Sequence, residues 1–207
     1  FHHIHADVDL AFSAAQEAIA FSQKHGFVQW LGDALFVRGW CLVQHGQISE
    51  GIKDIKYVID ELKIRIGSEL AMTHYYWALA DAYQKKGDLM RSLDYLNTAV
   101  KFRNRSGRFW LANVYESMGN VQQQLGEYEE KVVNSYKKAI RVAKEQKARL
   151  FELRATNSWA ELHLDRGRPE AAAELLEPLV TWFTEGHETA DLRRAHALLA
   201  RAKQQLT

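Results

Sequence analysis

The sequence of 207 residues contains a single cysteine, Cys41, and only two prolines, Pro169 and Pro178. One cysteine cannot form an intramolecular disulfide, which indicates a reducing compartment. The scarcity of proline and the abundance of Ala, Leu, Glu, Gln, Lys and Arg are typical of helices with few interior breaks. We therefore expect an all-α chain.

Long apolar runs and an excess of charge of one sign are also missing. Arg38 interrupts the most apolar run, residues 34–43, so no stretch has the length of a membrane span. No basic segment followed by an apolar segment opens the chain as a secretion signal would. The formal net charge is +1, which gives no long-range field to hold nucleic acid. We expect a soluble, cytoplasmic protein that binds neither membranes nor nucleic acid.

Glycines reveal an internal repeat. Two interleaved series each have a period of about 40 residues: Gly46, Gly87, Gly126 and Gly167 in one, and Gly26, Gly67, Gly107 and Gly186 in the other. The second series has a vacant place near Lys147. Glycine just past a helix end adopts the left-handed conformation without a Cβ clash. The two series therefore predict helix, turn, helix, turn, repeated along the chain.

The residues between the glycines support this interpretation. Apolar residues after Gly46 step by three and four, as on one face of a helix: Ile48, Ile52, Ile55, Ile59, Leu62 and Ile66. Pro169 fits the first turn of a helix, whereas Pro178 falls inside residues 171–183 and is expected to bend that helix.

A small–small–bulky pattern recurs in register and resembles the tetratricopeptide repeat (TPR). The small residue of the first helix matches Gly39, Ala80, Gly119 and Ala160, and that of the second helix matches Gly51, Ser92 and Ala172, with Val132 as a poor fit. The bulky position matches Ile55, Leu96, Tyr136 and Leu176. Small residues let two helices approach closely while a bulky one fills the adjoining gap.

The resemblance implies a right-handed α-α superhelix, a TPR-like solenoid of about ten antiparallel helices. We expect a single repeat domain over residues 1–207, beginning with a partial repeat at 1–25. Helical hairpins are expected at 29–66, 69–105, 108–146 and 150–185, and a C-terminal capping helix at 188–206. Because the chain begins within a repeat, we interpret it as a fragment whose uncovered face at residues 7–25 allows oligomerisation.

Other residues carry a more specific resemblance. They are Arg38-Gly39-Trp40 with Gly46, Glu152-Leu153-Arg154-Ala155, and the ending from Trp182 to Leu192 followed by Ala195 and Ala197-Leu198-Leu199. Together they resemble the C-terminal TPR region of bacterial multidomain signalling proteins. Those proteins carry a class III adenylate or guanylate cyclase domain, or a DNA-binding domain, before a signal-transduction ATPase. The resemblance implies a regulatory or scaffolding module whose partners include intramolecular ATPase and cyclase domains.

Motifs of common active sites are missing. The sequence contains no GxxxxGK[ST], GxSxG, HExxH or paired CxxC. His45, His74 and His163 lie on different repeats and share no spacing that marks a triad, and Cys41 is interpreted as a small packed residue. We expect no catalytic residue, no cofactor and no enzyme activity.

Charged clusters have two interpretations each. His2, His3 and His5 either chelate a divalent metal or belong to a helix tail, which we favour. Lys137, Lys138, Arg141, Lys144 and Lys147 form a basic stretch that we expect to be a solvated outer face rather than a nucleic-acid or lipid contact. We expect no metal site.

The resemblance to TPR places the first helices of each pair on a concave, partner-binding face. Residues expected there by register are Phe36, Trp40, Trp77, Asp81, Asn113, Glu116, Asn120, Arg154, Asn157 and Glu161. Aromatic and arginine side chains are favoured interface anchors, and asparagines pair with the backbone of an extended peptide.

Three functions remain open from the sequence. The favoured one is a protein- or peptide-binding module that acts as sensor or scaffold of a signalling ATPase or cyclase. A small-molecule receptor with an apolar pocket at Phe36, Trp40 and Trp77 is a second, and a purely structural oligomerisation module is a third. Trp40 and Trp77 are equally well interpreted as packing between neighbouring helices.

Overall fold

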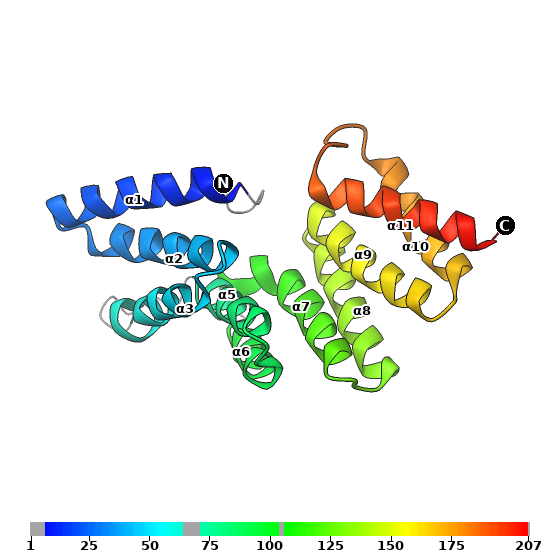
Figure 1. Cartoon of the computed structure of the whole chain (residues 1–207), viewed down its shortest axis with the longest axis horizontal. Coiled ribbons are helices and arrows are strands. Elements are labelled where there is room, and N and C mark those ends of the chain that lie inside the picture. Colours follow the sequence, from blue (N-terminus) through cyan, green and yellow to red (C-terminus); the bar gives the residue numbers. More distant parts are fainter. Residues whose placement is uncertain (1–6, 64–70, 104–105, 207) are drawn as a thin grey trace. The chain divides into compact units, whose positions relative to one another are not determined.

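The computed structural model describes residues 7–63, 71–103 and 106–206, and within these ranges it contains ten α-helices and no strand. Within each unit, the helices of a pair, such as α5 and α6 or α7 and α8, run antiparallel and are joined by a short turn (Figure 1). The expected all-α class is confirmed. The chain divides into two compact units, Phe1–Trp110 and Leu111–Thr207. His2, His3 and His5, the candidate metal cluster, lie outside the described residues.

Unit 1 is built from paired helices in chain order. They are α1 (Val8–His25), α2 (Val28–Gln44), α3 (Ile48–Tyr57) continued by the π-helical turn η1 (Val58–Lys63), α5 (Met72–Lys85), α6 (Leu89–Lys101) and the 3-10 turn η2 (Ser106–Trp110). Helix α2 packs on both α1 and α3, and α5 packs on α6. Their shared core includes Phe36, Ile55, Tyr75 and Leu79.

The second helix of the first complete pair differs from the expected single α-helix. It changes at Val58 from α-helical to π-helical hydrogen bonding. Both Val58 and Ile59 are buried there, beside Ile55. A π-helical turn holds more residues than an α-helical one, so the simple spacing of three and four does not continue through it.

Unit 2 repeats the same pattern and ends in an additional helix. It contains α7 (Leu111–Gln124), α8 (Glu129–Glu145), α9 (Arg149–Asp165), α10 (Pro169–Trp182) and α11 (Ala190–Leu206). Helix α11 packs on α10 and α9 through the buried residues Leu192, Ala195, Leu198 and Ala202. It therefore covers the apolar side of the last pair.

Residues with positive φ mark the turns between helices. Six are glycines, namely Gly26, Gly46, Gly87, Gly126, Gly167 and Gly186, and among the described residues one non-glycine joins them, Lys147 with φ of 55°. Lys147 lies in the turn between α8 and α9, where the glycine series has its vacancy. The turn geometry is therefore kept even though the residue is not glycine.

Small residues bring the helices of each pair into contact. Ser92 of α6 donates a hydrogen bond of 2.8 Å from Oγ to the carbonyl oxygen of Ala80 in α5. Gly119 of α7 lies against the ring of Tyr136 in α8, where an added Cβ would be 2.4 Å from Cε1. The small–bulky pattern of the sequence thus has a direct steric basis.

Candidate functional site

Phe36 and Trp40 are core residues of unit 1, contrary to their expected place on an open binding face. They are only 2% and 6% exposed. Phe36 packs with centroid distances of 4.6 Å to the His74 ring and 4.4 Å to the Tyr75 ring, both on α5. Apolar side chains at these positions bury their surface against the next repeat, so little of either ring is left for a ligand.

Trp77 and Asp81 on α5 are half-buried. The Trp77 ring stacks on His74 at 5.8 Å and on Trp110 of η2 at 5.7 Å between centroids. Asp81 accepts a 3.1 Å hydrogen bond from Gln44 Nε2 of α2. It also pairs with Lys85 at 3.1 Å. Both side chains are therefore held in place by neighbours within unit 1.

The polar residues of α7 are linked to α8 and α9. Glu116 accepts hydrogen bonds from Asn120 Nδ2 at 2.7 Å and from Ser158 Oγ of α9 at 2.8 Å. The Tyr136 hydroxyl of α8 donates to Asn120 Oδ1 at 2.8 Å. Burial raises the pKa of Glu116 above its ordinary value, and the two hydrogen bonds oppose that rise. Asn113 is almost completely buried.

Helix α11 engages the three predicted site residues of α9. Arg154 Nε donates to Asp191 Oδ2 at 2.9 Å, and Asn157 Nδ2 donates to the backbone oxygen of Asp191 at 3.0 Å. Glu161 forms an ion pair of 2.6 Å with Arg194. Asn157 is fully buried, whereas Arg154 and Glu161 keep part of their surface. Asp191 and Arg194 of α11, which were not among the predicted site residues, therefore hold these three side chains.

Several of these hydrogen bonds join equivalent helices of successive repeats, as in Gln44–Asp81 and Glu116–Ser158. Such bonds fix the rotamers of partly exposed polar side chains and so reduce the entropy that a partner's binding would cost. The half-buried members of the predicted set are Trp77 and Asp81 in unit 1 and Glu116, Asn120, Arg154 and Glu161 in unit 2.

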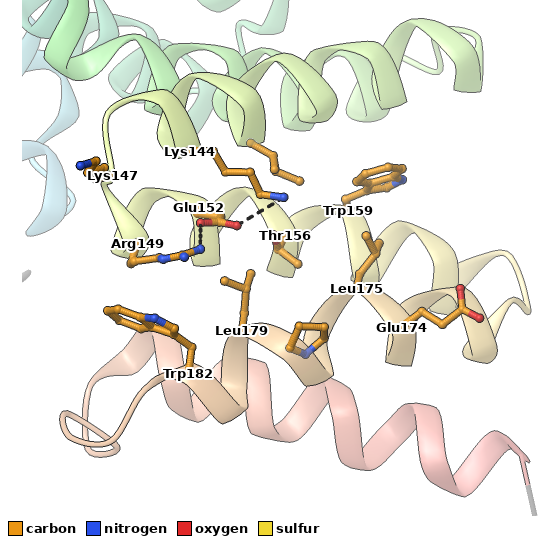
Figure 2. Close-up of a pocket in the computed structure, with 12 residues that line it drawn as sticks. Lys144, Lys147, Arg149, Glu152, Thr156, Trp159, Glu174, Leu175, Leu179 and Trp182 are labelled. Carbon is orange, nitrogen blue, oxygen red and sulfur yellow. Dashed lines mark hydrogen bonds and ion pairs between the residues drawn. The ribbon is translucent and has the colours of Figure 1, made fainter.

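A different feature of unit 2 was missed by the sequence analysis. A cleft of about 960 Å³ lies between α8 and α10, with α9 as its floor. Figure 2 shows its lining residues, which are Ile140, Lys144, Lys147, Arg149, Glu152, Thr156, Trp159, Glu174, Leu175, Pro178, Leu179 and Trp182. We call it the outer cleft.

Glu152 is the buried polar centre of the outer cleft. The residue is only 3% exposed. It pairs with Arg149 at 2.7 Å and with Lys144 at 3.7 Å (Figure 2). The Arg149 guanidinium also lies 5.1 Å from the centroid of the Trp182 ring, within cation–π range. These contacts hold two cations and one indole at the same end of the cleft.

The outer cleft and the predicted site residues use opposite faces of α9. Glu152, Thr156 and Trp159 follow a spacing of four and three, which places them on one side of the helix. Arg154 and Glu161 are offset from them by about half a turn and contact α11 instead. Two sequence signals pointed to this region, namely the vacant glycine place at Lys147 and the basic stretch that includes Lys144 and Lys147.

Other reactive groups have structural roles in unit 1. Cys41 is completely buried, and desolvation raises the pKa of its thiol to about 11. His45 lies 2.9 Å from Asp9 of α1 at the surface. Across residues 7–63, 71–103 and 106–206, histidine, cysteine, aspartate and glutamate side chains nowhere gather in a group of three or more suited to a metal ion.

Among the helices that the structure describes, none combines the length and the hydrophobicity needed to cross a membrane.

A family model described as tetratricopeptide repeat matches residues 73–105 of the sequence. These residues contain α6 and all of α5 except its first residue, Met72. The chain thus carries a TPR repeat, in agreement with the resemblance drawn from its small and bulky residues. No curated protein matches the sequence.

Several solved structures share the fold. BtubC (BKLC) from P. vanneervenii is 14% identical, with a TM-score of 0.69 over 96% of this chain and 91% of that one. A putative kinesin light chain with TPR-like repeats from Podosopora anserina is 18% identical, with a TM-score of 0.63 over 84% and 86%. A Rap protein complexed with competence and sporulation factor is 14% identical, with a TM-score of 0.68 over 99% and 61%. The fold is therefore a TPR-like solenoid.

Proposed function

We propose that this chain is a protein- or peptide-binding module whose first helices carry the binding surface. Its TPR-like fold supports a role as an interaction scaffold, and the similar Rap protein was solved with a bound factor. The observation that carries the proposal is the set of repeat-to-repeat hydrogen bonds, between α2 and α5 in unit 1 and among α7, α9 and α11 in unit 2. Within each unit they fix polar side chains, and such preorganisation favours specific recognition.

The proposed contact residues are the half-buried ones. Trp77 and Asp81 supply an indole and a carboxylate in unit 1. Arg154 and Glu161 supply opposite charges in unit 2. Phe36 and Trp40 stabilise the core of unit 1 and are not proposed as contact residues, since both rings are buried.

Affinity capture from bacterial lysate with quantitative mass spectrometry tests this surface. Trp77→Ala and Arg154→Ala variants are compared with the parent chain and with Arg141→Ala, whose side chain is exposed on α8. Hot-spot side chains contribute about 2 kcal/mol or more, or about thirty-fold in affinity. A partner captured by the parent and by Arg141→Ala but lost with the other two supports the proposal. Equal capture by all four chains contradicts it.

We further propose that the module regulates a larger bacterial signalling protein with ATPase and cyclase domains. The motifs from Trp182 to Leu192 and around Glu152 support this context through their resemblance to such proteins. A ligand that prefers one conformation of the repeats shifts its population and so alters the attached domains. Nucleotide turnover by the larger protein, measured with and without the captured partner, checks this. Unchanged turnover under saturating partner contradicts it.

Self-association is a second candidate function, which an exposed aromatic group on unit 1 favours. The rings of Phe21 in α1 and Phe27 lie 6.1 Å apart, and Phe21 is 58% exposed. Exposed apolar clusters of this kind are typical of interaction sites. Sedimentation over a range of concentrations compares the parent with Phe21→Glu. A dimer that disappears in the variant supports this function, and a monomer at all concentrations contradicts it.

A further inference from the structure

Lys147 occupies a backbone conformation that suits glycine. Its φ of 55° is in the left-handed region, and among the described residues all others with positive φ are glycines. A lysine is strained there because its Cβ crowds the following carbonyl oxygen. The turn between α8 and α9 would therefore be easier to form with glycine. Strain of this kind is often found where the side chain has a function.

The Lys147 side chain lines the outer cleft together with two further cations, Lys144 and Arg149 (Figure 2). The buried Glu152 carboxylate pairs with both Arg149 and Lys144, and thereby fixes their positions. This end of the cleft therefore carries three positively charged side chains and one carboxylate. The end of the outer cleft nearest Lys147 is therefore positively charged and suits an anionic group.

The rest of the outer cleft is largely apolar. Leu179 projects from α10 between the positive end and Trp159, and Leu175 projects from α10 opposite Trp159, as Figure 2 shows. Trp182 is more than half exposed and has the Arg149 guanidinium over its ring. Large aromatic side chains beside fixed arginines are typical anchors of protein interfaces. A ligand that is apolar along its length and acidic at one end would match this order of side chains.

We propose that the outer cleft is a second binding site, separate from the first-helix surface, for an extended acidic peptide segment with bulky apolar side chains. The segment lies along α9 between α8 and α10, with its carboxylates beside Lys147 and Lys144 and its apolar side chains against Trp182 and Leu179. The volume of about 960 Å³ is at the upper limit for small-molecule sites. The arrangement of charge at one end and apolar surface beyond it favours a chain that runs along the cleft.

Fluorescence anisotropy with a labelled probe tests the proposal. The probe is a short fluorescein-labelled peptide in which a run of glutamates is followed by alternating leucine and phenylalanine. The matched probe carries lysines in place of the glutamates. We expect saturable binding of the acidic probe alone, weakened by added salt because screening reduces its attraction to the cations.

Lys147→Gly is the informative variant, because it removes the charge while providing the residue that the backbone favours. We expect the dissociation constant of the acidic probe to rise about tenfold, while thermal unfolding shows a chain at least as stable as the parent. Trp182→Ala is expected to weaken binding of the acidic probe to a similar extent. Arg141→Ala, which removes an exposed charge from α8 outside the cleft, is the matched control and should bind like the parent.

Glu161→Ala separates this site from the first-helix surface, since Glu161 lies on the opposite face of α9 and pairs with Arg194. It should leave the acidic probe unaffected. The proposal is overturned if the two probes bind equally, if the acidic probe does not saturate at low salt, or if Lys147→Gly binds it as tightly as the parent. Binding of anilinonaphthalene sulfonate in the cleft without binding of the acidic probe would assign the site to small anions instead.

Discussion

Gly39 of α2 and Gly51 of α3 meet backbone to backbone. A Cβ added to Gly51 would lie 2.4 Å from the carbonyl oxygen of Gly39, and one added to Gly39 would lie 2.9 Å from Cβ of Asp54. Beside this contact, the Arg38 guanidinium donates two hydrogen bonds of 2.7 and 2.9 Å to the Asp54 carboxylate. The first complete helix pair is thus closed by a steric contact and a bidentate ion pair at the same place.

Gly51→Ala is expected to destabilise the chain. The added methyl meets backbone, which cannot move aside as a side chain would, and overpacking of this kind costs about 1–3 kcal/mol. The better helix propensity of alanine returns about 1 kcal/mol. Because the clash is with backbone, we expect an overpacking cost in the upper part of that range, about 2–3 kcal/mol, and hence a net loss of about 1–2 kcal/mol in urea unfolding. Lys53→Ala, at an exposed position of the same helix, should change stability by less than about 0.5 kcal/mol. A Gly51→Ala chain as stable as the parent would show that α2 and α3 separate easily.

Lys147→Gly is expected to stabilise the chain by about 0.5–1 kcal/mol. It relieves the left-handed strain of the lysine, worth about 1–2 kcal/mol, and loses part of this gain to the greater freedom of glycine in the unfolded state. Arg141→Gly, in the middle of α8, should have the opposite effect and cost about 1 kcal/mol. Thermal unfolding of both variants measures the difference. A less stable Lys147→Gly chain would mean that contacts of the lysine outweigh its strain.

The fold was predictable because its signals are local. A glycine past a helix end and a small residue at a helix crossing are each required by local steric limits. Gly46 and Gly119 could therefore be interpreted from the sequence without knowledge of the neighbouring repeats. The change to π-helical bonding at Val58 was not predictable, since apolar residues spaced by three and four fit an uninterrupted α-helix equally well.

The candidate site was predictable only in part, because exposure depends on the neighbouring repeat. Phe36 follows the helical register expected of a binding face, but side chains of α5 cover it, and register alone does not show how large those side chains are. The partners of Arg154 and Glu161 come from α11, more than thirty residues away. The outer cleft is formed by three helices together, and the sequence indicated it only through the lysine at a glycine place and the basic stretch around it.

Arg149→Ala is expected to lower the free energy of unfolding by about 2 kcal/mol. The reason is that the substitution leaves the buried Glu152 carboxylate without its shorter ion pair. Glu152 is buried, and without Arg149 its remaining described cation is Lys144 at 3.7 Å. A buried charge deprived of a partner is destabilising by about 1–3 kcal/mol or more. Chemical denaturation of Arg149→Ala, Glu152→Gln and the double variant forms a mutant cycle. We expect the double variant to be more stable than Arg149→Ala alone, and purely additive losses would rule out this coupling.

Glu116→Gln tests the half-buried carboxyl where α7 contacts α8 and α9. Burial raises the pKa of Glu116, which the charges of Arg154 and Arg194 and the hydrogen bonds from Ser158 and Asn120 only partly offset. The folded chain therefore holds this proton to a higher pH than the unfolded chain does. Glutamine keeps an oxygen that accepts from Ser158 and Asn120 but has no proton to lose.

The sign of the effect follows from proton linkage. Below the ordinary pKa of 4.5, Glu116 is protonated in both states and its contribution to stability is fully present. As pH rises from there through the raised pKa, the unfolded state loses the proton first, so the free energy of unfolding falls. We therefore expect the stability of Glu116→Gln relative to the parent to increase across this window and then level off. Urea unfolding of both chains at a series of pH values measures that difference. A difference independent of pH would show that the folded structure does not disfavour the charged form of Glu116.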